Sequence, residues 1–160
     1  MIKPHSETCC ANAVILEVQE VLFRFMRAFD NKDWDDLSKC LFEDIYCDYS
    51  SFRDESPCHI SQKEYIVKRE QAHSNLKMQH NLSNVSVRLQ DGHAEVRCNY
   101  SIYRFHPEFK GSRDHYFHSY GQYLFVLKQD NGHWKIASIT QKLLINDGNP
   151  ELHGGTQPQK

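Results

Sequence analysis

Four side chains in this sequence have the types and the spacing that proton transfer requires. Asp30 follows the apolar Phe29 at the end of an amphipathic segment, and Tyr49 lies in Asp-Tyr-Ser-Ser-Phe. His80 lies in Met-Gln-His-Asn-Leu and His118 in Tyr-Phe-His-Ser-Tyr, both in segments of two-residue alternation. A buried imidazole beside a carboxylate can move a proton near neutral pH, because burial lowers its pKa while the carboxylate raises it. The pattern therefore indicates a pocket for acid–base chemistry.

Each of these residues also has an ordinary structural interpretation. Asp30 could be a turn carboxylate, although a negative charge is not favoured at the C-terminal end of a helix dipole, so a partner should hold it there. His80 could be a core histidine bonded to a backbone carbonyl. His118 could line a pocket wall or lie on an exposed sheet surface. Tyr49 and Phe52 could be core aromatic residues.

Helices are predicted in the first half of the chain, where apolar residues recur at helical spacing. Asn12 and Asp33 are suitable N-caps for the first two helices, and Ser61 with Glu64 forms a capping-box pattern for the third. The predicted helices cover Ala13–Phe29, Trp34–Leu41 and residues 61 to about 73.

Strands are predicted where the period changes to two. Tight turns at Asp91-Gly92 and at Asp130-Asn131-Gly132 should join neighbouring strands, and Arg53–Ile60 should be a loop. Helices followed by a meander of antiparallel strands favour the α+β class. The predicted strands are Asp44–Ser51, Met78–Leu89, His93–His106, His115–Gln129 and Trp134–Ile145.

The strand His115–Gln129 has two different faces. His118 and Tyr120 share one face, which would suit a pocket wall and would equally suit an exposed sheet surface. The opposite face is apolar, and a patch of this kind is not expected to stay in water, which predicts a homodimer or homotrimer. The residues of this second face are Phe117, Tyr123, Phe125 and Leu127.

The order of elements resembles the nuclear transport factor 2-like superfamily, and the residues Asp30–Phe52 with the two histidines resemble the scytalone dehydratase-like and SnoaL-like families. The resemblance covers roughly Val14–Ile145. It implies a cone-shaped α+β barrel, with N-terminal helices packed in a curved, mostly antiparallel sheet that encloses one pocket. It also implies that Asp30 supports a histidine, that His80 is the base, and that His118 binds or protonates a leaving hydroxyl.

The resemblance assigns further residues to substrate binding. Tyr49 would polarise a substrate carbonyl, and Phe52 would pack on the substrate. The family has a tyrosine where this chain has Phe29, so half of a carbonyl-activating tyrosine pair is absent. Tyr100 or Tyr120 is the candidate replacement donor.

Together, the residues and the resemblance predict a cofactor-independent dehydratase, a lyase that acts on a small polyketide- or terpenoid-like carbonyl compound, in secondary metabolism. An isomerase or cyclase would use the same base and oxyanion donor. A non-catalytic small-molecule-binding or assembly module would use the same fold. The distance from Asp30 to a histidine distinguishes an enzyme from a binding module. A pair within hydrogen-bond distance favours an enzyme, while a filled cavity or exposed histidines favour a module.

Composition and spacing limit the remaining possibilities. The length of 160 residues predicts one domain over 12–146, with a flexible N-terminal arm over 1–11 and a flexible C-terminal tail over 147–160. The net charge of −2 gives no basic excess for nucleic acid, and no apolar run approaches the roughly 18 residues of a membrane span. The six cysteines form no C-x-x-C pair, and no secretory h-region is present, which predicts reduced thiols in the cytoplasm.

No metal or cofactor is expected. His115 and His118 are three residues apart on a predicted strand, so they point to opposite faces and are poorly placed to share an ion. The sequence contains no HExxH, G-x-G-x-x-G or Walker motif. A small-molecule substrate is the expected ligand.

Overall fold

The computed structural model describes residues 5–108 and 113–153, and the side chains from residue 10 onward except that of residue 113. Three helices lie in the first half, and the four long strands follow them. The helices are α1 (His5–Asn31), α2 (Trp34–Lys39) and α3 (Gln62–His73). The strands are β1 (Leu41–Asp48), β2 (Cys58–Ser61), β3 (Lys77–Gln90), β4 (His93–Phe105), β5 (Phe117–Asp130) and β6 (His133–Gly148). Two 3-10 turns, η1 (Arg113–His115) and η2 (Pro150–Leu152), complete the described chain.

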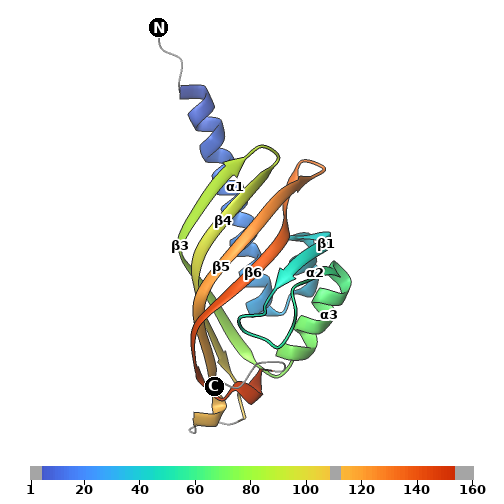
Figure 1. Ribbon diagram of the computed structural model, residues 1–160, viewed down its shortest axis with the longest axis vertical. Helices are drawn as coiled ribbons and strands as arrows, with labels where there is room; N and C mark the ends of the chain where they lie inside the picture. The colour runs from blue at the N-terminus through green and yellow to red at the C-terminus, as the bar shows by residue number, and fades with distance from the viewer. Residues whose placement is uncertain (1–4, 109–112, 154–160) are drawn as a thin grey trace.

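The six strands form one curved sheet in the order β2-β1-β6-β5-β4-β3. Neighbouring strands are antiparallel except β1 and β6, which are parallel. The sheet curls around α1, while α2 and α3 lie beside β1 (Figure 1). The predicted α+β cone is therefore confirmed, although the sheet stays open between its edge strands β2 and β3.

The core forms where the apolar stripe of α1 meets the inner face of the sheet. Val18, Leu22 and Phe25 are buried from the helix, and Phe125 and Ile139 are buried from the sheet. Full burial of one such side chain stabilises the fold by about 1.5–3 kcal/mol relative to leaving it exposed. This packing fixes the position of Phe29 and Asp30, at the end of α1, relative to the sheet.

Local signals set several element ends as predicted. The Asp33 side chain accepts a hydrogen bond from the Asp36 amide and caps α2. Ser61 and Glu64 form the predicted capping box at the start of α3. In the turn between β5 and β6, Asn131 and Gly132 have φ of 51° and 81°, the positive values that a tight hairpin turn of this kind requires.

Other boundaries differ from the prediction. The first helix begins at His5 rather than near Asn12, so it includes the described part of the predicted arm; residues 1–4 lie outside the described residues. Nothing in His5–Ala11 breaks a helix, and an existing helix extends by one hydrogen bond per added residue. The predicted loop Arg53–Ile60 contains most of β2, which is too short for a periodicity signal.

The prediction for the two faces of β5 is wrong. Phe117, Phe125 and Leu127 are fully buried, and Tyr123 is nearly so. The more apolar face of β5 packs against the core. Because side chains alternate along a strand, His118 lies on the opposite face of the sheet. The apolar face on which the oligomer was predicted is therefore buried inside the fold. Self-association stays an untested prediction.

The prediction of a loose tail from residue 147 is wrong for the described residues 147–153. Strand β6 continues to Gly148, and η2 leads to His153, which is 1% exposed. The Asn149 amide donates to the Tyr116 carbonyl and ties this segment to the start of β5. Within the described ranges, no helix is long and apolar enough to cross a membrane.

Candidate functional site

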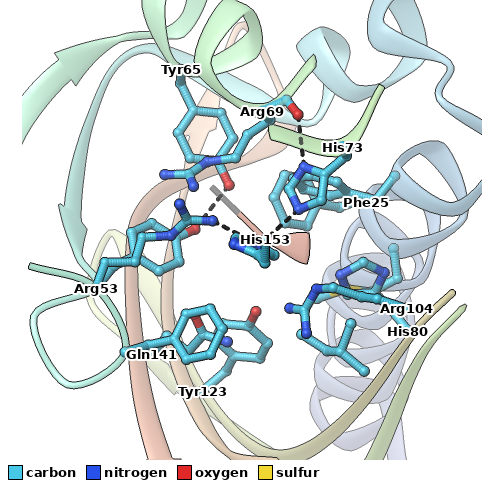
Figure 2. Close-up of a pocket in the computed structure, with 15 residues that line it drawn as sticks. Phe25, Arg53, Tyr65, Arg69, His73, His80, Arg104, Tyr123, Gln141 and His153 are labelled. Carbon is cyan, nitrogen blue, oxygen red and sulfur yellow. Dashed lines mark hydrogen bonds between the residues drawn. The ribbon is translucent and has the colours of Figure 1, made fainter. Parts of the chain in front are cut away.

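A small cavity lies between the C-terminal part of α1, helix α3 and the inner face of the sheet (Figure 2). The space left inside it is about 30 Å³, which is room for about two water molecules. Its lining residues are Phe25, Met26, Phe29, Tyr49, Phe52, Arg53, Tyr65, Arg69, His73, His80, Ile102, Arg104, Tyr123, Gln141 and His153.

Asp30 and His80 form the predicted hydrogen-bonded pair. The His80 Nδ1 atom lies 2.7 Å from Asp30 Oδ1. The His80 backbone amide donates to both carboxylate oxygens, at 3.0 Å each. These contacts join the last turn of α1 to β3 and supply the partner that a carboxylate at this helix end requires. The pair therefore lies within hydrogen-bond reach.

The protonation state of His80 follows from these contacts. A carboxylate only accepts hydrogen bonds, so Nδ1 carries the proton, and Nε2 of the neutral ring keeps its lone pair. The His80 side chain is 6% exposed. Burial lowers the pKa of His80 and outweighs the hydrogen bond and charge of Asp30, which raise it; the charge of Arg104 lowers it further. The ring is therefore neutral at pH 7 and available as a base.

Two tyrosine hydroxyls face each other on another wall of the cavity. Tyr49 Oη lies 2.8 Å from Tyr65 Oη. Burial raises the pKa of Tyr49 well above 10 and that of Tyr65 to about 12. Both hydroxyls are therefore protonated at neutral pH. One of them donates to the other, which leaves the second free to donate a hydrogen bond to a substrate oxygen.

Comparison with known proteins assigns the chain to a family. A family model described as a SnoaL-like domain matches residues 13–140. This chain belongs to the SnoaL-like domain family. A scytalone dehydratase of Colletotrichum orbiculare is 27% identical over 137 residues, which cover 80% of this chain and 72% of that protein.

Solved structures show the same fold at low sequence identity. A Kribbella flavida protein superposes on this SnoaL-like protein with a TM-score of 0.83 and 16% identity, over 89% of this chain and 97% of that one. A candidate scytalone dehydratase from Novosphingobium aromaticivorans gives a TM-score of 0.74 and 15% identity, over 89% and 96%. These identities support the shared fold and leave the chemistry to be argued from the site.

The structure places only part of the predicted site in the cavity. Phe29 and Phe52 line it together with Tyr49 and His80. Asp30 lies behind His80 and reaches the cavity through that ring. The SnoaL-like fold thus brings together the predicted base, its carboxylate, one hydroxyl donor and two aromatic walls.

Three predicted residues lie elsewhere. His118 and Tyr120 are on the opposite face of β5, where His118 packs against Tyr103 at 5.0 Å between ring centres and accepts a hydrogen bond from the Arg104 amide at 3.4 Å. Tyr100 is buried against Tyr123 in the core, with 4.6 Å between ring centres, and does not line the cavity. The wrong assignment of the two faces of β5 explains why His118 and Tyr120 were predicted in the cavity but lie outside it.

Sequence reasoning missed three arginines and two histidines of the cavity. Arg104 continues the inward-facing alternation of Tyr100 and Ile102 along β4, and an arginine in phase with an apolar strand face was a usable signal. Arg69 lies four residues from both Tyr65 and His73, which places the three on one face of α3. Arg53 and His153 lie in segments predicted to be irregular, so no periodicity pointed to them.

His153 occupies the centre of this group (Figure 2). Its Nε2 lies 3.0 Å from His73 Nε2 and 2.9 Å from an Arg53 Nη atom. His73 Nδ1 donates to the Arg69 carbonyl, so the neutral His73 ring can only accept at Nε2. His153 Nε2 must then donate to His73, and it cannot accept from Arg53 at the same time.

We expect the buried histidines to make this protein sensitive to acid. Burial, followed by the charge of Arg104, lowers the pKa of both His73 and His153 well below 6.5. As the pH falls below 6.5, the unfolded chain binds protons that the native state does not, so the free energy of unfolding should fall. Each histidine contributes up to about 1.4 kcal/mol per pH unit. Chemical denaturation between pH 7.5 and pH 5 measures this slope.

A matched pair of variants assigns the slope. His153→Gln should reduce the slope of the free energy of unfolding against pH by the contribution of one proton, about 1.4 kcal/mol per pH unit. The same change at His133, an exposed residue at the start of β6, should leave it unaltered. A slope that is the same in both variants would contradict the assignment.

Proposed function

We propose that this SnoaL-like protein is a cofactor-independent dehydratase, a lyase that removes water from a small polyketide- or terpenoid-like carbonyl compound in secondary metabolism. The observation that carries the proposal is the 2.7 Å contact between Asp30 and His80 at the wall of a cavity. The relationship to a scytalone dehydratase supports the same class of reaction.

The first step is removal of a proton from carbon. His80 Nε2 takes the proton from the carbon next to the substrate carbonyl. The C–H electron pair forms a double bond to the carbonyl carbon, and the π pair of the carbonyl moves to its oxygen. The resulting imidazolium is stabilised by Asp30, whose carboxylate accepts a hydrogen bond from Nδ1–H. The Tyr49 and Tyr65 hydroxyls are candidate donors to the developing enolate oxygen.

The second step releases water. The enolate electrons return to form a carbon–carbon double bond, and the bond from the adjacent carbon to its hydroxyl group breaks. The hydroxyl leaves as water when His80 gives it the proton taken in the first step. One histidine can serve both steps if the proton and the hydroxyl leave from the same side of the substrate.

An isomerase is the second candidate, and the position of His118 favours it. The residue expected to protonate a leaving hydroxyl lies outside the cavity, so the proton held by His80 could return to a different carbon instead. Both reactions begin with the same base.

The cavity must open for either reaction. Its space of about 30 Å³ is too small for a ring-containing substrate, so at least one lining side chain has to move.

Mass spectrometry of metabolite extracts tests the proposal. Purified protein is added to an extract in heavy water, and compounds are sought that change only when the protein is active. Loss of the mass of one water indicates a dehydratase, and uptake of deuterium without that loss indicates an isomerase. No difference between wild-type protein and His80→Ala would contradict both.

Tyr49→Phe should lower the turnover number by about tenfold, the worth of one hydrogen bond. It also leaves the buried Tyr65 hydroxyl without its partner, which should lower the free energy of unfolding by about 1–3 kcal/mol. The assay is turnover of the compound found in the extract. Tyr46→Phe is the matched control, since Tyr46 lies on the same strand and packs on His59 away from the cavity. Equal losses in the two variants would mean that the Tyr49 hydroxyl does not act on the substrate.

A further inference from the structure

Three arginines from different elements meet in the cavity. Arg53 follows β1, Arg69 lies on α3 and Arg104 lies on β4; they are 5%, 4% and 2% exposed. In Figure 2, Arg53 and Arg69 lie on one side of His153 and Arg104 on the other. A guanidinium stays charged at neutral pH, so a chain of net charge −2 concentrates three positive charges around one small space.

Aromatic rings separate these charges. The Arg69 guanidinium lies 4.5 Å from the centre of the Tyr49 ring and 4.8 Å from that of Tyr65. The Arg104 guanidinium lies 5.5 Å from the centre of the Phe52 ring, and that of Arg53 lies 5.8 Å from the same ring. Ring faces attract cations, but they do not replace the hydrogen-bond acceptors that a buried guanidinium loses when it leaves water.

Two of the arginines lack an anionic partner. Among the described residues, no ion pair involves Arg69 or Arg104, and the cavity lining contains no aspartate or glutamate. The Nε atoms of Arg69 and Arg104 are buried and have no hydrogen-bond acceptor within the part of the chain that the structure describes. Arg104 keeps one bond, from Nη1 to Ser119 Oγ at 2.9 Å. Asp30 is already held by His80.

Buried charge without a counter-ion is costly in the free protein, and a bound anion would remove that cost. A carboxylate is planar, and the fork of a guanidinium matches it with two parallel hydrogen bonds.

We infer that the substrate carries a carboxylate, and that the guanidinium groups of Arg69 and Arg104, with Arg53, hold it in this cavity. The identification of the ligand as a substrate rests on the proposed function. Binding of the carboxylate itself does not, and it can be measured without turnover.

Titration calorimetry and thermal denaturation of the full-length protein test the inference. The probes are acetate and pyruvate, with acetamide and inorganic phosphate as comparisons, all at constant ionic strength. We expect the two carboxylates to bind and to raise the melting temperature, while acetamide does neither. Binding of phosphate without binding of either carboxylate would overturn the assignment, as would an effect of acetamide equal to that of acetate.

Arginine variants locate the site. Arg69→Met and Arg104→Met should each weaken carboxylate binding by about tenfold to a hundredfold, the worth of a charge-assisted hydrogen bond. Each should also keep or raise the melting temperature of the free protein, because an unpaired buried charge is removed. Arg97→Met is the matched control, since Arg97 is exposed on the same strand as Arg104 and lies outside this cavity. Undiminished binding in both cavity variants would overturn the inference.

The outcome separates the two proposals. If His80→Ala binds acetate as wild-type protein does but has lost turnover, both stand. If carboxylates bind while His80→Ala turns over normally, the proposed reaction fails and the anion site remains. If no carboxylate binds while His80→Ala is inactive, the anion site fails and the reaction remains.

Discussion

Replacing His80 by alanine should lower the turnover number by about two to four orders of magnitude, the usual worth of a positioned acid–base group. The imidazole is the lining group with an unprotonated nitrogen and a carboxylate behind it, so its removal leaves the C–H proton without an acceptor. The measurement is single-turnover kinetics on the compound that the protein converts in extracts. Circular dichroism and a denaturation curve establish that the variant is folded.

His118 provides the matched control for this experiment. Like His80 it lies on a long strand, but its ring is on the opposite face of the sheet, between Tyr103 and Tyr116. His118→Ala should therefore keep turnover within a few-fold of the wild-type value. A folded His80→Ala protein with full activity, or a His118→Ala protein that has lost as much, would show that the base has been assigned to the wrong ring.

Asp30→Asn should lower the turnover number by at least about a hundredfold, because it removes the charge that stabilises the imidazolium. The pH dependence should change as well. Asp30 raises the pKa of His80, so without it the pKa should fall further, and the acid limb of the rate profile should move to lower pH. The pH–rate profile measures both effects.

Asp33 is the matched control for Asp30. It lies three residues further along and caps α2, and asparagine caps a helix as well as aspartate does. Asp33→Asn should keep both the rate and its pH profile. A merely structural Asp30 would reduce stability without moving the acid limb, and that result would contradict its role beside the base.

The part of the site that sequence predicted correctly depends on local order. Asp30 follows an uninterrupted apolar helical stripe, and His80 alternates with Met78 and Leu82, so periodicity placed both on their elements. The resemblance to the SnoaL-like families supplied their functional roles. The capping box at Ser61 and the turn at Asn131-Gly132 were likewise fixed by neighbouring residues.

The missed part depends on packing between distant segments. Both faces of β5 carry aromatic residues, so the sequence did not reveal which face the core would take, and His118 was placed on the wrong side. His153 reaches the cavity because the tail after Gly148 is bound to Tyr116, a contact between segments that no local pattern encodes. Buried arginines are rare, so residue type did not point to Arg69 and Arg104 as cavity residues.

The protonation state of the His80 ring, measured by nitrogen-15 NMR of labelled protein, tests the account most directly. Its resonances are assigned as those that disappear in His80→Gln, and no substrate is needed. At pH 7 we expect a neutral ring with the proton on Nδ1 and a bare Nε2, which becomes an imidazolium only below pH 6.5. A ring with its proton on Nε2, or one already charged at pH 7, would contradict the account, because no lone pair would then be available to take a proton from carbon.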